Sequence, residues 1–188
     1  MLREEQFESA LGAARGGADW AWREIYEALA PLVLGYLRGR GAADPEDLTG
    51  EVFAQVVRDL GDFEGDRRAF RAWLLTIARN RLFDERRRQA RRPEQPHPDP
   101  GSATEADAPV ATDAADDALA RIGLERVTRM LAGLSGDQRD VILLRIVGDL
   151  SLDEVARVMG KRRGAIKQLQ RRGLAALRRR LEQERVER

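Results

Sequence analysis

Two stretches of the chain carry side chains suited to holding nucleic acid. Residues 63–88 interleave arginines with aromatic rings, and residues 161–172 form a second basic run. Guanidinium groups bind phosphate oxygens and aromatic rings stack on unpaired bases, whereas arginine and glutamine on a helix read base edges in a duplex groove. The first stretch therefore predicts contact with a single strand, and the second predicts contact with a duplex.

Residues for other kinds of chemistry are scarce. The chain has no cysteine and one histidine, His97, so thiolate or histidine metal sites and a histidine-based triad have no basis. Glycine-rich phosphate loops are missing. An enzyme acting on nucleic acid would need a nucleophile or clustered carboxylates beside the first basic stretch, which offers only Asp84 and Glu85. We predict a protein that is not an enzyme and has no cofactor and no metal.

Charge is distributed in blocks, although the formal net charge is only +1. Residues 1–66 hold 6 basic and 14 acidic side chains, and residues 67–92 hold 10 basic and 2 acidic ones. Residues 93–117 hold 7 acids and no lysine or arginine, whereas residues 161–188 hold 11 basic and 3 acidic side chains. The two basic blocks are candidate footprints for nucleic acid. No apolar run is long enough to cross a membrane and no signal-peptide pattern begins the chain, so we expect a cytoplasmic protein without membrane insertion.

The first basic stretch is predicted to be a helix that begins after Asp66, a plausible N-cap. One apolar stripe is predicted to be buried and comprises Phe70, Trp73, Leu74, Ile77 and Ala78. A second flank mixes charge, an amide and a ring, and comprises Thr76, Arg79, Asn80, Phe83, Arg86 and Arg87. The alternative is a solvated arginine-rich helix with every ring buried. Phe63, in the preceding loop, either faces nucleic acid or fills the core.

Helices are also predicted before this segment, at residues 3–15, at 19–38 with a kink at Pro31, and from Asp44 to Leu60. Asp44-Pro45 has the form of a helix start, with an N-cap followed by proline at the first position. The apolar side of this third helix is Leu48, Val52, Phe53, Val56 and Leu60. Its polar stripe is Asp47, Glu51, Gln55 and Arg58, which either is simply solvated or docks a partner.

Residues 116–188 are predicted to form a second domain that ends in a helix-turn-helix. Ser151 and Glu154 have the spacing of a capping box, Gly160 provides the turn, and a basic helix begins near Arg163. Residues 93–115, rich in Pro, Asp, Ala and Thr, cannot bury enough apolar surface to order themselves. We therefore predict an all-α fold of two small helical domains, 1–92 and 116–188, joined by a flexible acidic linker.

The chain closely resembles the extracytoplasmic-function (ECF) class of bacterial RNA polymerase sigma factors. The resemblance covers about residues 18–92 and 116–182 and rests on three segments in order. They are PEDLTGEVFAQVV, FEGDRRAFRAWLLTIARNRLFDERRR and LSGDQRDVILLRIVGDLSLDEVARVMGKRRGAIKQLQRRGLAALRRRL. It implies a factor that binds core RNA polymerase and promoter DNA and is held inactive by an anti-sigma factor.

The resemblance also implies roles for individual residues. Docking on the clamp helices of the largest polymerase subunit is implied for Asp47, Leu48, Glu51, Gln55 and Arg58. The flap region of the polymerase is implied as a further contact of the factor. Capture of the melted minus-ten strand is implied for Phe63, Asp66, Arg67, Arg68, Trp73, Thr76, Arg79, Asn80 and Phe83. Reading of the minus-thirty-five duplex is implied for Arg162, Arg163, Lys167, Gln168, Arg171 and Arg172.

One departure from the family pattern affects sequence preference. Family members often show a Ser-Arg pair where this chain has Gln168-Leu169, so the minus-thirty-five preference stays open. The alternative function is a conventional helix-turn-helix regulator that binds duplex DNA without polymerase and uses its N-terminal domain for sensing or dimerisation.

Overall fold

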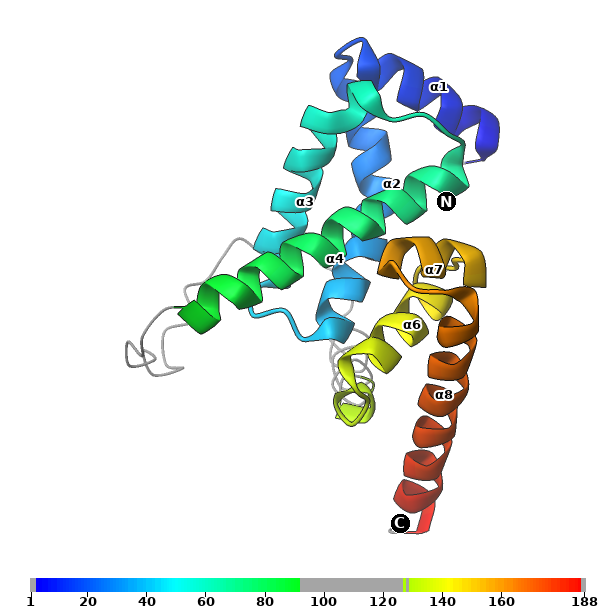
Figure 1. The fold of residues 1–188 in the computed structure, drawn as a ribbon. Helices are drawn as coiled ribbons and strands as arrows, with labels where there is room; N and C mark the ends of the chain where they lie inside the picture. The colour runs from blue at the N-terminus through cyan, green and yellow to red at the C-terminus, as the bar shows by residue number, and fades with distance from the viewer. Residues whose placement is uncertain (1–2, 92–126, 128, 187–188) are drawn as a thin grey trace.

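The protein is helical throughout the part of the chain that the structure, a computed structural model, describes: residues 3–91, 127 and 129–186. Figure 1 shows the arrangement, with α4 crossing α2 and α8 running away from the body toward the C-terminus. The elements are α1 (Glu4–Arg15), α2 (Asp19–Arg40), α3 (Pro45–Asp59), the short 3₁₀ helix η1 (Leu60–Asp62), α4 (Arg67–Arg91), α6 (Gly136–Ile146), α7 (Leu152–Met159) and α8 (Arg163–Val186). The predicted all-α class is confirmed for these residues.

The predicted helix starts before α3 and α4 are confirmed. The Asp44 carboxylate accepts a hydrogen bond from the Asp47 backbone N–H at 2.8 Å, and Pro45 occupies the first helical position. The Asp66 carboxylate accepts one from the Ala69 N–H at 2.7 Å, directly before α4. Each aspartate satisfies a backbone donor that the first turn of a helix leaves unpaired.

Aromatic rings fill the N-terminal half of the core. The Phe70 ring is fully buried and meets the rings of Phe7, Phe63 and Trp73 at centroid distances of 5.2, 5.2 and 5.4 Å. These rings come from α1, the loop after η1, and α4. The cluster therefore fixes the start of α4 against both neighbouring segments.

The helix-turn-helix is confirmed in α7 and α8. The Ser151 hydroxyl accepts from the Glu154 N–H at 3.2 Å, and the Glu154 carboxylate accepts from the Ser151 N–H at 2.6 Å. Gly160 ends α7 in the left-handed conformation with φ of 61°, which glycine adopts without strain. Ile166 on α8 is fully buried beneath the turn. An equivalent capping box at Ser135 and Gln138 opens α6.

Some residues lie differently from the sequence prediction. Helix α2 continues to Arg40, past its predicted end at residue 38, so Gly39 lies inside it. Two large apolar side chains of the helices are exposed: Trp20 is 55% exposed and Ile146 is 66% exposed. The predicted linker, 93–115, lies outside the described residues, as do residues 116–126 and 128 of the predicted second domain.

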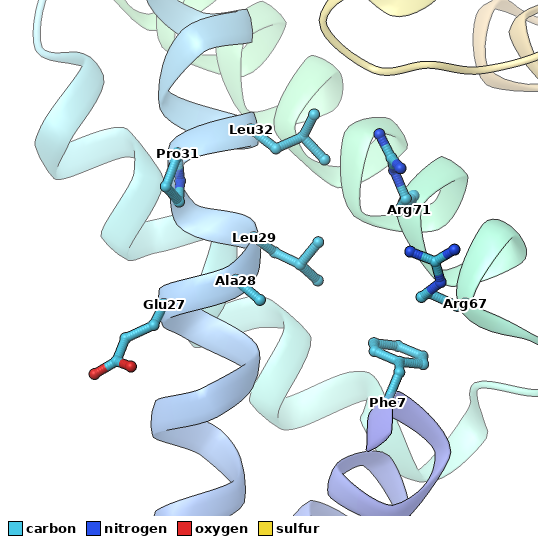
Figure 2. Close-up of a pocket in the computed structure, with 8 residues that line it drawn as sticks. All are labelled: Phe7, Glu27, Ala28, Leu29, Pro31, Leu32, Arg67 and Arg71. Carbon is cyan, nitrogen blue, oxygen red and sulfur yellow. The ribbon is translucent and has the colours of Figure 1, made fainter. Parts of the chain in front are cut away.

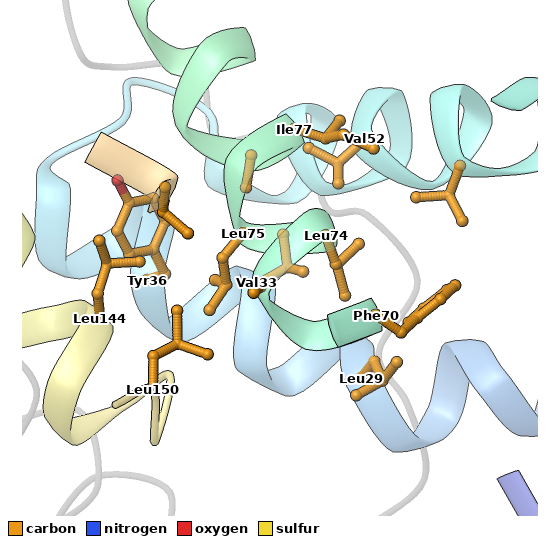
Figure 3. Packing of buried hydrophobic residues seen from close by; sticks show 14 of the residues in the cluster. Leu29, Val33, Tyr36, Val52, Phe70, Leu74, Leu75, Ile77, Leu144 and Leu150 are labelled. Atoms are coloured by element: carbon orange, nitrogen blue, oxygen red, sulfur yellow. The ribbon is translucent and has the colours of Figure 1, made fainter. Parts of the chain in front are cut away.

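The N-terminal half of the chain, α1 to α4, packs against the C-terminal half, α6 to α8. Helix α2 packs on α6 and α4 packs on α7, and the buried apolar side chains of both halves belong to one cluster. Figure 3 shows Leu75 of α4 and Tyr36 of α2 beside Leu144 and Leu150. The sequence made no prediction of this packing.

Truncation of Phe70 tests the aromatic cluster. We expect Phe70→Ala to lower the free energy of unfolding by about 3 to 5 kcal/mol, because it leaves a cavity among three rings. Urea unfolding followed by circular dichroism measures this change. The exposed Trp20→Ala is the control and should change the unfolding free energy by less than about 0.5 kcal/mol. Equal effects of the two variants would contradict the assignment of Phe70 to the core.

Candidate nucleic-acid interface

A groove of about 640 Å³ runs along the N-terminal half of α4, next to the aromatic cluster. Its lining includes Trp73 and Thr76 of α4 and three carboxylates, those of Asp59, Asp62 and Glu64. Arg157 and Val158 of α7 close one side. Three of the predicted minus-ten residues, Phe63, Trp73 and Thr76, line this groove together.

Phe63 and Trp73 stack on each other, with ring centroids 5.0 Å apart and 28° between their planes. Of the two predicted positions for Phe63, the structure supports the core, because the ring is only 7% exposed. Trp73 is half-buried and presents the accessible part of the stack. A base entering the groove would therefore meet Trp73 first.

The middle of α4 carries a second concave surface, of about 460 Å³, lined by Arg79, Asn80, Phe83, Asp84 and Arg87. Asn80 is exposed, so its amide is free to face a base. The Arg79 guanidinium lies 4.6 Å from the centre of the Phe83 ring, a cation–π contact. The Thr76 hydroxyl, by contrast, donates to the Ala72 carbonyl of its own helix at 2.8 Å.

The remaining predicted minus-ten residues cluster at the start of α4. Asp66 serves as the N-cap, and the Arg67 Nε donates to the Glu4 carboxylate of α1 at 3.0 Å. Arg68 is exposed. Their common place on the first turn is confirmed, and their contact with DNA stays a prediction.

A separate cavity of about 400 Å³ lies between α1, α2 and α4. Figure 2 shows its apolar lining by Phe7, Leu29 and Leu32, with Arg67 and Arg71 along one side. Of the residues predicted to touch nucleic acid, it includes Arg67 alone. This cavity is not part of the groove beside Trp73.

The polar stripe of α3 is partly tied to α4. Asp47 and Arg58 are exposed, whereas the Gln55 amide oxygen accepts from the Arg81 Nε at 2.8 Å. Glu51 lies within ion-pair distance of two arginines of α4, 3.7 Å from Arg81 and 3.8 Å from Arg88. Leu48 is 3% exposed, so its expected place on the contact surface is wrong: the side chain packs in the core.

The outward face of α8 is exposed as predicted. Arg162, Arg163, Lys167, Gln168, Arg171 and Arg172 all lie on the surface. The Arg163 Nε lies 3.4 Å from the Asp153 carboxylate of α7, so this arginine is partly neutralised within the helix-turn-helix. The other side chains present a continuous basic surface suited to phosphate oxygens and base edges.

Comparison with known proteins identifies the family. Residues 25–92 match the family model Sigma-70 region 2, and residues 130–179 match Sigma-70, region 4. The ECF RNA polymerase sigma factor SigK of Mycobacterium ulcerans is 32% identical over 173 residues, which cover 88% of this chain and 87% of SigK. The chain belongs to the ECF class of RNA polymerase sigma factors.

Two further matches extend this result. The ECF RNA polymerase sigma factor BldN of Streptomyces coelicolor is 36% identical over 167 residues, which cover 88% of this chain but only 61% of BldN. The sigma factor RpoE of Bartonella quintana, solved with the anti-sigma factor NepR, has a TM-score of 0.61 at 21% identity. That match covers 85% of this chain and 96% of RpoE and shows a shared fold.

The two family matches fall on different parts of the fold. The region 2 match contains α3, α4 and all of the predicted minus-ten residues, and the region 4 match contains the helix-turn-helix. Within the described ranges, no group of histidine, cysteine and carboxylate side chains is arranged to hold a metal ion. No helix in those ranges is long and apolar enough to span a membrane.

Sequence reasoning missed one buried polar cluster of this ECF sigma factor. Asp140 of α6 is fully buried and binds Tyr36, Arg40 and Arg79 of the other half of the chain. A signal was present, because Asp140 directly precedes the apolar run 141–144 and so falls within the part of α6 that must be buried. An isolated carboxylate at such a position requires a partner.

The capping box of the helix-turn-helix contains a carboxylate, Glu154, whose pKa lies below its ordinary value. Burial acts to raise the pKa of Glu154, but its hydrogen bonds with Ser151 and the positive charges of Arg68 and Arg157 lower the pKa below the ordinary value. A lowered pKa in the folded state means that the carboxylate contributes stability above the unfolded-state pKa and loses it as pH falls through the folded value.

We therefore expect Glu154→Gln to lower the free energy of unfolding by about 1 kcal/mol at pH 7. The difference from the native protein should shrink as pH falls below 4.5, the ordinary pKa of a glutamate. Thermal unfolding between pH 3.5 and pH 7 measures it. Glu182→Gln, at an exposed position of α8, is the matched control. A difference that is constant across this range would rule out the proposed titration.

Proposed function

We propose that this ECF sigma factor binds core RNA polymerase, directs it to specific promoters and stabilises the melted strand at the start of transcription. The supporting observation is the combination, on one chain, of two concave surfaces along α4, one lined by Trp73 and one by Asn80, with an exposed basic helix-turn-helix. The first surface suits an unpaired strand and the second suits a duplex. Neither surface requires a bond to be made or broken, so the protein acts by binding.

The proposed contacts would favour strand separation because they form only with unpaired bases. Unstacking a base costs a few kcal/mol, which stacking on an aromatic ring and contacts to the flipped base offset only after the strand has opened. We assign these contacts to Trp73 and the Asn80 amide, which lie about two turns apart on α4. Melting driven in this way needs no nucleotide hydrolysis.

Polymerase docking is assigned to the polar stripe of α3. Asp47 and Arg58 are exposed at opposite ends of the helix, with Glu51 and Gln55 half-buried between them. An anti-sigma factor is a further proposed partner, because RpoE, which shares the fold, is solved with one. Such a protein would compete for the same docking surface.

The test is transcription with purified components. The protein is added to core polymerase with a library of promoter fragments, and run-off transcripts are sequenced. We expect transcripts that start at a common pair of promoter elements and are absent with core polymerase alone. Tight duplex binding without polymerase, combined with no initiation on any fragment, would instead favour a conventional helix-turn-helix regulator.

The two surfaces predict different defects. Asn80→Ala should lower promoter opening by about tenfold with little loss of duplex capture, because it removes a contact made in the melted state. Arg171→Ala should mainly weaken duplex capture, by about five- to tenfold, because it removes a contact to the closed duplex. Permanganate reactivity of unpaired thymines measures opening, and gel shift measures capture. Equal loss of both steps in both variants would contradict this division.

A further inference from the structure

The contact between the two halves is centred on the Asp140 carboxylate. One oxygen accepts a hydrogen bond from the Tyr36 hydroxyl at 2.8 Å and lies 2.7 Å from the Arg40 Nε. The other accepts from the Arg79 Nε at 3.1 Å. One carboxylate of α6 thereby joins side chains of α2 and α4.

This cluster is almost inaccessible to water. The side chains of Asp140 and Arg40 are 1% and 3% exposed, and Tyr36 is fully buried. Burial, together with the nearby Asp140 charge, raises the pKa of Tyr36 well above its ordinary value, so the hydroxyl stays a donor. Buried charges are tolerated only in exchange for close partners, and removing one partner leaves the others uncompensated. Loss of any one partner therefore weakens the contact between the halves.

Close backbone contact accompanies the charge cluster. A Cβ placed on Gly39 of α2 would lie 2.6 Å from the Leu143 Cδ2 of α6, so any larger residue there would displace the buried Leu143 side chain. On the other side of the interface, the Arg71 guanidinium donates to the Gly148 carbonyl at 2.9 Å. The contact is thus packed along two sides of Asp140.

The packed arrangement interferes with both proposed tasks. Arg157 and Val158 of α7 form one side of the groove that holds Trp73, and Arg79 is engaged by Asp140. The minus-ten and minus-thirty-five elements are named for positions about 25 base pairs apart, or about 85 Å of duplex. Halves that are in direct contact cannot occupy two elements at that separation.

We propose that Asp140 is an intramolecular latch that holds the free sigma factor closed, and that the halves separate when the factor engages core polymerase. The expected effect on transcription rests on the proposed function. The closed state itself does not, because it is a property of the free chain. The occupant of the α2/α4 surface is the chain's own region 4. When the halves separate, Arg79 is released from Asp140 and α7 moves away from the groove beside Trp73, so that both become accessible to DNA.

A disulfide lock tests the closed state directly. A Cβ on Gly35 would lie 3.4 Å from the Val147 Cγ1 across the interface, and the native chain has no cysteine. In Gly35→Cys/Val147→Cys the pair should oxidise, because the Val147 Cγ1, close to where a cysteine Sγ would lie, is within 3.4 Å of the Gly35 Cβ position. We expect the oxidised protein to give run-off transcripts reduced by about tenfold or more, with full recovery on reduction. The Gly35→Cys single variant under the same oxidation is the control.

Removing the latch should have the opposite effect. In Asp140→Asn the charges of Arg40 and Arg79 lose their counter-ion, so we expect a larger radius of gyration in X-ray scattering at unchanged helicity. The apparent Kd for core polymerase should fall by about tenfold, because a larger fraction of the free protein is open. The control is Asp149→Asn, which removes a 77% exposed carboxylate of the same interface, 3.8 Å from Arg71, and should change neither quantity.

A steric variant separates opening from unfolding. Gly39→Ala inserts a methyl group against Leu143 while raising the helix propensity of α2, so it should open the interface without weakening the N-terminal half. Its radius of gyration should rise as in Asp140→Asn. Unchanged scattering in both variants, or full transcription by the oxidised double-cysteine protein, would overturn the latch.

Failure of the proposed function is recognised separately. If the native protein initiates at no promoter, the proposed function is wrong. The closed state is then tested only by the radius of gyration from X-ray scattering. A larger radius of gyration in Asp140→Asn than in Asp149→Asn would still support it.

Discussion

A charge buried away from water must be paired, and this constraint governs how the two halves of the protein sit together. The Asp140 carboxylate is enclosed by Tyr36, Arg40 and Arg79, all from the other half of the chain. Without those partners, the burial of Asp140 would cost several kcal/mol. The position of α6 against α2, and so of the helix-turn-helix against α4, depends on this cluster.

Helix α4 serves both the core and the surface. Its apolar stripe anchors the aromatic cluster through Phe70, while the neighbouring flank carries Trp73 and Asn80. Rigid packing on one side holds the surface side chains at fixed positions, which lowers the entropy lost when a strand binds. Arg79 lies between these tasks, because its guanidinium reaches both the Phe83 ring and the Asp140 carboxylate.

The proposed latch and an anti-sigma factor would act on the same equilibrium. Each would lower the fraction of sigma factor able to bind polymerase, one from within the chain and one from outside it. A ligand that prefers the open state shifts the population only by its difference in affinity for the two states. Core polymerase, with docking sites for both halves, is placed to supply that difference.

Local chemistry in the sequence determined the helices and the side chains of the two proposed binding surfaces. The caps at Asp44, Asp66 and Ser151 follow from short-range hydrogen bonds, and the basic face of α8 follows from helical periodicity. Only the tertiary structure decided that Phe63 is buried, because the accessibility of this loop ring depends on segments distant in the chain. The same holds for Asp140, whose partners lie 61 and 104 residues away at Arg79 and Tyr36. Periodicity identifies which face of α6 is buried, but long-range packing alone selects what covers it.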